Sequence, residues 1–200
     1  INWQRPTVGP AGEDVWLSDG RVQVYQLAIS GTPRPHISAL TQRQVDAPLV
    51  APMVVLESTA FGIVRGSSQD ILRRWAVADW QSLQQTELPG QIVWGPHPLG
   101  DYVLLMTNEG DLVSVDGQTQ RFSMDTITSA AIGMPQQYDD GFVLATMDGS
   151  IWHLDAISGQ VRTKVDVGEA LGTGPVPFAG NRFIVCGADG TLHIVALTGE

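Results

Sequence analysis

The sequence contains one cysteine, one lysine and no apolar run long enough to cross a bilayer. A single cysteine excludes an internal disulfide. Cys186 lies in the apolar segment FIVCG, which predicts a buried small side chain, with a reactive thiol as the alternative. The first residues, INWQRPTVGP, have the features of neither a signal peptide nor a transit peptide, so they indicate no compartment.

Basic residues are scarce as well. The chain has 11 Lys and Arg residues against 21 Asp and Glu residues, which gives a formal net charge of −10 at pH 7. An acidic surface repels phosphate groups, so we expect no nucleic-acid partner and no attachment to an anionic membrane. The class of partner that remains is another protein, or another domain of a larger chain.

A helical apolar stripe is also missing. The 200 residues are 43% hydrophobic and include 22 glycines and 12 prolines, a composition typical of strands and turns. The nearest candidate for a helix, residues 71–88, carries Ile71, Trp75 and Val77, which favour strands, and we interpret it as two strands. The sequence therefore predicts an all-β protein.

Five segments share one pattern, in which a strand-like apolar run, a turn and a second apolar run follow one another. They are residues 15–31, 61–79, 102–117, 142–159 and 183–199. The turns are centred on Gly20, Gln69, Gly110, Gly149 and Gly190, at intervals of 39 to 49 residues. Because a short hairpin cannot bury its apolar face alone, each unit must be covered by its neighbours. This repeat is typical of a β-propeller, and we predict about five blades of four strands.

We interpret residues 1–200 as one propeller domain. Its predicted units are approximately residues 4–45, 46–89, 90–127, 128–168, and 169–200 together with 1–3. In the fourth unit the strands are expected at 130–137, 142–147, 151–155 and 160–167. Proline recurs in the expected inner strands, which indicates that these strands are short and irregular. The positions are Pro10, Pro52, Pro96, Pro135 and Pro175.

Residues 148–160, DGSIWHLDAISGQ, match a known repeat closely, and residues 189–200, DGTLHIVALTGE, match it more loosely. Both resemble the repeat of the quinoprotein-type (PQQ-like) β-propeller family, approximately D-G-x-L-Y-A-L-D-A-x-T-G-K-x-x-W. Residues 109–118 keep its turn and third strand, whereas Thr163 replaces its tryptophan in the fourth unit. The resemblance implies a bacterial protein, with an extracytoplasmic location in the periplasm or cell envelope.

Enzymes of that family are longer and depend on a calcium-bound cofactor, a catalytic aspartate and often adjacent cysteines. None of these can be located in this sequence, so the resemblance implies the non-enzymatic branch, without a cofactor.

The two ends of the sequence also match the repeat when they are joined. Gly199, Glu200, Ile1, Asn2 and Trp3 reproduce the pattern G-x-x-x-W. We therefore predict that the N-terminal strand completes the last blade and closes the ring, which would remove two exposed sheet edges. The alternative is an excerpt from a longer array of seven or eight blades.

No catalytic motif accompanies the repeat. Acidic residues recur at equivalent turns, which turn chemistry explains better than catalysis or calcium binding. They are Glu13, Asp101 and Asp140 at one kind of turn, and Asp19, Glu109, Asp148 and Asp189 at another. The histidines lack the spacing of zinc ligands, and His153 and His193 are expected on opposite faces of their sheets.

Four residues are candidates for contact with a partner: Trp80, Arg34, His36 and His97. Trp80 lies in a turn, where it would either be an exposed anchor for a partner or pack against the neighbouring blade. The tryptophans of the apolar strands are expected to pack between blades. Arg34 and His36 lie in residues 30–38, the longest departure from the repeat. His97 follows a proline in an expected inner strand, where it would face the channel.

These observations favour a noncatalytic scaffold whose loops bind another protein or domain. It would be similar in kind to the propeller lipoproteins of outer-membrane assembly or to repeat domains attached to bacterial signalling proteins. The alternative hypothesis is a propeller enzyme that binds a quinone, calcium or a carbohydrate.

Overall fold

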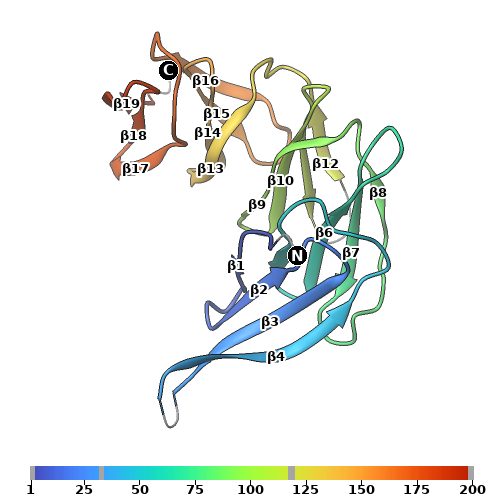
Figure 1. The fold of residues 1–200 in the computed structure, drawn as a ribbon. Helices are drawn as coiled ribbons and strands as arrows, with labels where there is room; N and C mark the ends of the chain where they lie inside the picture. Colours follow the sequence, from blue (N-terminus) through green and yellow to red (C-terminus); the bar gives the residue numbers. More distant parts are fainter. Residues whose placement is uncertain (1–2, 32–33, 117–119, 198–200) are drawn as a thin grey trace.

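Figure 1 shows the fold as a computed structural model, which describes residues 3–31, 34–116 and 120–197. The described residues form five antiparallel sheets and no helix. Four sheets have four strands, and the fifth has three. None of the described residues belongs to a helix that could span a membrane. The predicted all-β architecture of about five small sheets is confirmed.

We number the sheets 1 to 5 in chain order. Sheet 1 contains β1 (Thr7–Val8), β2 (Asp14–Ser18), β3 (Gln23–Ser30) and β4 (His36–Gln44). Sheet 2 contains β5 (Val54–Leu56), β6 (Thr59–Val64), β7 (Ile71–Ala76) and β8 (Thr86–Glu87). Sheet 3 contains β9 (Ile92–Leu99), β10 (Tyr102–Thr107), β11 (Leu112–Asp116) and β12 (Gln120–Met124). Sheet 4 contains β13 (Ala131–Tyr138), β14 (Gly141–Thr146), β15 (Ser150–Asp155) and β16 (Val161–Asp166). Sheet 5 contains β17 (Val176–Ala179), β18 (Arg182–Cys186) and β19 (Leu192–Ala196).

Strand positions agree closely with the sequence pattern. Every strand end predicted for the fourth unit lies within one residue of the observed end. Residues 71–88 form two strands, β7 and the short β8, as predicted. Sharp turns explain this agreement, because Asp and Gly hold the chain in conformations that end a strand at a defined residue. At the β14–β15 turn, for example, Gly149 has a φ of 100°, and Asp148 accepts hydrogen bonds from Ser150 N (3.3 Å) and Thr146 Oγ1 (2.6 Å).

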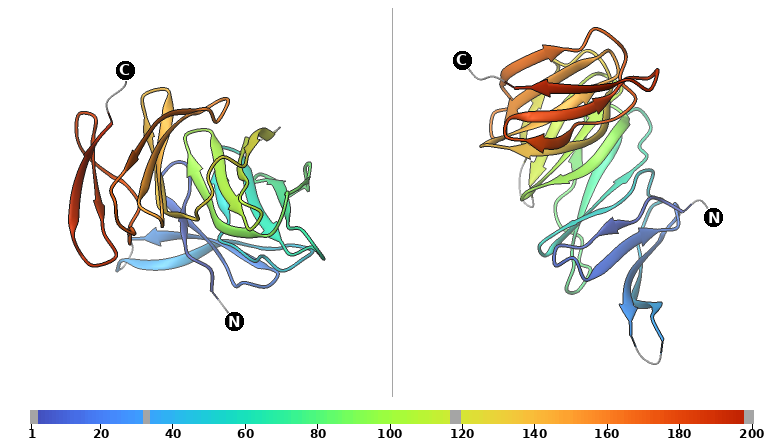
Figure 2. Two further views of the ribbon diagram at one scale, coloured as in Figure 1. Left: turned by 90° about the horizontal axis from the view of Figure 1, so that it is seen from above. Right: turned by 90° about the vertical axis from the view of Figure 1, so that its left-hand side faces the viewer.

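The five sheets pack face to face in a curved array. Figure 1 and the two views of Figure 2 show sheet 1 at one end and sheet 5 at the other. The first strands of successive sheets approach one another: β1 with β5, β5 with β9, and β9 with β13. Four apolar layers separate the sheets, one for each neighbouring pair. Strands β10 and β14 are buried along their whole length, because each lies inside a sheet that is covered on both faces.

The third strand of each sheet directs alternate side chains toward the next sheet. Directly paired residues face the same side, so the register identifies equivalent positions across the sheets. One position carries an apolar residue throughout: Val24, Leu72, Leu112, Ile151 and Leu192. The position two residues further on is polar in the first four sheets and apolar in the fifth: Gln26, Arg74, Ser114, His153 and Ile194. Each layer between sheets therefore contains a polar group of different chemistry.

Proline follows the prediction only in part. Pro96 and Pro135 lie within the inner strands β9 and β13, at irregularities in their register with β10 and β14. Pro10 instead lies in the turn after β1, and Pro52 and Pro175 precede β5 and β17. Proline has no N–H to donate to a ladder, so it is tolerated where pairing is interrupted or has not begun.

Closure of the ring by Trp3 is wrong. The Trp3 ring lies 5.7 Å from the ring of Tyr25, between centroids, and Gln4 N donates a hydrogen bond to Ser18 O. The N-terminal segment thus packs on sheet 1, because the apolar outer face of that sheet lies directly beside it. Figures 1 and 2 show sheet 1, on which Trp3 packs, and sheet 5 at opposite ends of the array. The other residues of the joined motif lie outside the described residues.

Candidate functional site

The hairpin β3–β4 is the most prominent projection of the molecule. Its strands pair from Gln23 with Gln44 to Ser30 with His36, and Figure 1 shows the far end standing clear of the other sheets. Ile29 and Ile37 pair directly across the hairpin and are both highly exposed. Large apolar side chains at such positions are unusual for a surface that contacts only water.

A groove of about 790 Å³ lies beside this hairpin, between sheets 1 and 2. Its apolar lining comes from both sheets and includes Trp16, Ala28, Leu40, Val55 and Val77. Its acidic lining residues are Glu13, Asp14 and Glu57. None of the described residues that line it is basic. We call this feature the hairpin groove. Its size and its apolar lining with few polar groups are typical of binding sites.

A short network of hydrogen bonds fixes the polar end of the hairpin groove. Asp14 Oδ2 accepts hydrogen bonds from Trp16 Nε1 (3.1 Å) and Gln26 Nε2 (2.5 Å). Gln26 Oε1 in turn accepts one from Thr41 Oγ1 (3.3 Å). These bonds join β2, β3 and β4, so the wall of the groove is held in a defined shape. Pre-organisation of this kind lowers the entropic cost of binding a partner.

Trp80 lies behind the floor of the groove. Its ring is stacked between those of Trp16 and Trp75, with centroid distances of 5.8 Å on both sides and interplanar angles of 5° and 4°. The residue is only half-buried, and its φ of 59° is a left-handed conformation that side chains other than glycine rarely adopt. Trp80 therefore packs between sheets 1 and 2 and supports Trp16. Direct contact between Trp80 and a partner stays a prediction.

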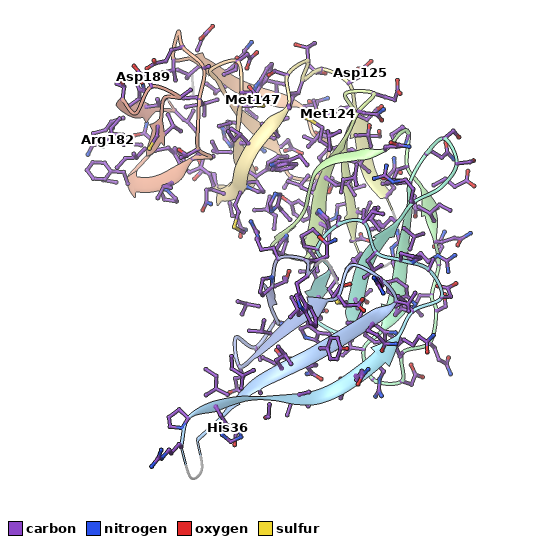
Figure 3. The ribbon with its side chains drawn as sticks, viewed as in Figure 1. His36, Met124, Asp125, Met147, Arg182 and Asp189 are labelled. Atoms are coloured by element: carbon purple, nitrogen blue, oxygen red, sulfur yellow. The ribbon has the colours of Figure 1, made fainter. Side chains whose placement is uncertain are left out.

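Arg34 and His36 lie at the far end of the hairpin. Both are exposed, and His36 Nδ1 forms a hydrogen bond with Arg34 O (2.8 Å). Figure 3 labels His36 at this end, away from the sheet array. Residues 32 and 33, in the loop between β3 and β4, lie outside the described residues. The structure thus places Arg34 and His36 on the element that borders the groove, and their contact with a partner stays a prediction.

His97 lies apart from the other candidates. It is 7% exposed, its ring centroid is 4.5 Å from that of Trp94, and its Nδ1 has no hydrogen-bond partner among the described residues. Burial, and secondarily the positive charge of Arg5, lowers the pKa of His97 from 6.5 to about 4. The imidazole is therefore neutral at pH 7. Its predicted role in partner binding is not tested by this geometry.

The acidic residues predicted at turns divide into two groups: some bond within their own turns, whereas Asp101 and Asp140 form ion pairs with Arg121 and Arg162. Asp19 accepts hydrogen bonds from the backbone N–H groups of Arg21 and Gln23, and Asp189 accepts one from Thr191 N (2.8 Å). These contacts are the turn chemistry expected from the sequence. Among the described residues, no group of three or more His, Cys, Asp or Glu side chains could hold a metal ion.

A second groove, of about 610 Å³, lies between sheets 2 and 3 and includes Glu57, Asp101 and Asp116 in its lining. Arg121 forms ion pairs with Asp101 (2.6 Å) and Asp116 (3.5 Å). Two of these three carboxylates are thus already paired with a cation, which makes them poor candidates for an acid–base pair.

The other histidines and the cysteine occupy structural positions. His153 packs edge-on against Tyr138 with a centroid distance of 5.0 Å, and burial lowers its pKa. His193 Nε2 contacts a carboxylate oxygen of Glu169. Cys186 is only partly buried, so the prediction of a buried side chain is wrong. Cys186 pairs with Leu192, so both side chains point to the same face of sheet 5. Among the described residues no other sheet packs on that face.

Solved structures share this fold at low sequence identity. BamB from Moraxella catarrhalis matches with a TM-score of 0.63 and 16% identity, over 97% of this chain and 58% of that one. The computationally designed Ika8 protein matches with a TM-score of 0.61 and 14% identity, over 92% and 56%. The C-terminal WD40 domain of Sif2 matches with a TM-score of 0.61 and 16% identity, over 92% and 54%. This chain therefore spans little more than half the length of these structures.

The fold is that of a β-propeller, as the repeat predicted. No family model matches the chain, and no curated protein matches it in sequence. The similarity to solved structures therefore establishes the fold alone.

Sequence analysis missed the residues that form the hairpin groove. Leu40 and Glu57 belong to different units, and only the packing of sheet 1 on sheet 2 brings them to one groove. One available signal was the length of the first repeat, since the interval from Gly20 to Gln69 is 49 residues and the other intervals are 39 to 41.

Proposed function

We propose that this chain is a noncatalytic β-propeller scaffold that binds a segment of another protein, or of another domain of a larger chain, in the hairpin groove. The observation that carries the proposal is the groove itself, which combines exposed apolar side chains with a wall stabilised by hydrogen bonds. Leu40, at the edge of this groove, is 55% exposed. Covering one such side chain contributes about 1 to 2 kcal/mol to association.

The lining of the groove defines the chemistry of the segment. Glu13, Asp14 and Glu57 give it negative charge, and the whole chain carries a net charge of −10. A complementary segment is extended, places apolar side chains on the floor and carries Lys or Arg beside them. Opposite charges of this kind raise the association rate and select among partners.

The resemblance to PQQ-like repeats supports the non-enzymatic branch of that family, without a cofactor. It also supports a bacterial protein located outside the cytoplasm, in the periplasm or cell envelope. Fractionation of the source cells, with detection of this chain by antibody, tests the location directly.

Partner binding is tested with Leu40→Glu, which places a negative charge at the edge of the groove. The matched control is Ile157→Glu, because Ile157 is an exposed apolar residue of the β15–β16 turn, on sheet 4. Tagged wild-type and variant proteins are crosslinked in cells of the source organism, and crosslinked partners are quantified by mass spectrometry. We expect a partner crosslinked to the groove to fall at least tenfold with Leu40→Glu and to be retained with Ile157→Glu.

The acidic residues of the hairpin groove allow a second, independent test of partner binding. Glu13→Gln together with Glu57→Gln should weaken the same partner several-fold in low salt and much less in 0.5 M salt, because salt screens exposed charges. Equal crosslinking by wild type and Leu40→Glu would refute the groove as the binding surface.

The alternative of a quinone, calcium or carbohydrate ligand has a direct test. A ligand that binds only the native state stabilises it by RT ln(1 + [L]/Kd) and thereby raises the melting temperature. We expect no saturable shift with calcium, a soluble quinone or a panel of sugars. A saturable shift with any of them would favour the enzyme hypothesis over the scaffold.

A further inference from the structure

The outer face of sheet 5 has the pattern of a covered surface. At the apolar position of the third strand, Leu72, Leu112 and Ile151 are each 0% exposed, because the next sheet lies on them. Leu192 occupies the equivalent position in sheet 5 and is 68% exposed. The same type of side chain is therefore buried in sheets 2, 3 and 4 and open to solvent in sheet 5.

The position two residues further along the third strand is likewise buried in the covered sheets and exposed in sheet 5. Ser114 and His153 are buried there, whereas Ile194 is 57% exposed. Val176 and Phe178 of β17 are exposed as well. Figure 3 shows sheet 5, with Arg182 and Asp189 labelled, at the end of the array and with no sheet beyond it.

Register identifies the remaining residues of this face. Ile184 pairs with Ile194, and Cys186 pairs with Leu192, so all four side chains point to the same side. In sheet 4 the equivalents of Ile184 and Cys186 are Val143 and Ala145, both 0% exposed. Val176 pairs with Ile184 and so faces the same side, and the Phe178 ring lies under the guanidinium of Arg182, which strand alternation places on that side. We call these six residues the end face: Val176, Phe178, Ile184, Cys186, Leu192 and Ile194. A contiguous apolar patch of this kind marks an interface.

We propose that the end face is covered in the native protein by a further four-stranded propeller sheet, contributed by the same polypeptide. Two observations support this occupant over any other. At three of its register-equivalent positions, those of Ile184, Cys186 and Leu192, the face is apolar like the surfaces that sheets 2, 3 and 4 present to their neighbours, so a sheet of the same kind fits it. At the fourth position Ile194 replaces a polar residue, which makes the face more apolar still. In addition, this chain matches only 58% of the BamB chain, so about two fifths of BamB has no counterpart in residues 1–200.

Cys186 reports on this contact, because it is the only cysteine of the sequence and lies on the end face. The first measurement is the intact mass of the gene product purified from its source. The second is the rate at which iodoacetamide alkylates Cys186, read by mass spectrometry of the peptide that contains it. The rate is compared between the native product, the same product in urea and the recombinant chain 1–200.

We expect a native mass well above 21.5 kDa and alkylation of Cys186 at least tenfold slower in the native product than in chain 1–200. Leu192→Glu together with Ile194→Glu, introduced into the native-length protein, should restore fast alkylation. Ile157→Glu is the matched control and should leave the slow rate unchanged.

Three results would overturn the proposal. A native product of only 200 residues would exclude further sheets in the same polypeptide. A longer product in which Cys186 reacts as fast as in chain 1–200 would show that the face is open. Protection of Cys186 in chain 1–200 that increases with protein concentration would show that a second copy covers it. None of these results bears on the hairpin groove, which lies at the other end of the array.

Discussion

Titration of His97 should make the stability of this protein fall steeply in mild acid. The pKa of His97 is lowered to about 4 in the folded chain, against 6.5 for an unperturbed histidine. The unfolded chain therefore binds a proton between these two pH values that the folded chain does not bind. Stability rises with pH wherever the unfolded state binds more protons, so it must fall as the pH decreases from about 6.5 to about 4.

The size of the effect follows from the shift. One pKa unit corresponds to about 1.4 kcal/mol, so the contribution of His97 at pH 4.5 is a loss of about 2 to 3 kcal/mol relative to pH 7.5. The burial of His97 beside Trp94 supports a shift of this size, since little solvent is available to stabilise the imidazolium. Arg5 opposes the charged form further.

The assay is urea unfolding at pH 7.5, 6.0 and 4.5 for the wild type and His97→Gln. Other groups titrate in the same range, including His153, whose pKa is also lowered by burial. The difference between the two proteins isolates His97, and His36→Gln at the exposed end of the hairpin controls for the substitution itself. Between pH 7.5 and pH 4.5 we expect the free energy of unfolding of the wild type to fall about 2 to 3 kcal/mol further than that of His97→Gln. Parallel curves for the two proteins would show that the reasoning about burial is wrong.

Three further predictions concern stability and are measured by thermal and urea unfolding. Gly149→Ala should cost at least 1 kcal/mol more than Gly168→Ala. Both glycines have positive φ, but a Cβ at Gly149 would collide with the backbone carbonyl oxygen of Glu169, whereas one at Gly168 meets nothing; equal losses would contradict this. Trp80→Ala should cost about 2 to 3 kcal/mol, because it removes the middle ring of a three-ring stack. Trp80→Phe keeps a ring at this position and should cost less than half of that. Arg74→Met and Asp116→Asn should each destabilise by about 2 kcal/mol, and the double variant by clearly less than the sum, because the two charges attract each other across the layer between sheets 2 and 3; strict additivity would argue against that coupling.

Local features of the fold could be predicted from the sequence because each depends on few neighbouring residues. The strands of sheet 4 follow from apolar alternation that ends at Gly149 and at the Asp140–Gly141 turn. Burial of Trp152 follows from the same alternation. The histidines illustrate the limit, since residue type alone could not show that His97 is buried.

Features that depend on the angle between sheets could not be predicted. The joined ends of the sequence, which include Trp3, do match the G-x-x-x-W motif. Closure of the ring, however, requires five sheets to turn through a full circle. Packing between layers sets that turn, and no single repeat contains it. The hairpin groove depends on residues such as Leu40 and Glu57 that are far apart in the chain. Cys186 is only partly buried because, among the described residues, no further sheet packs on its side of sheet 5.

The polar residues between the sheets have a consequence for folding. Arrays of similar units are prone to misassembly, in which one unit takes the place of another. Here the equivalent positions Gln26, Arg74, Ser114 and His153 differ in size, charge and hydrogen-bonding capacity. A sheet inserted in the wrong order would place a guanidinium or an imidazole against a neighbour that packs around a different side chain. The order of the sheets is therefore favoured by side chains that an apolar repeat alone could not supply.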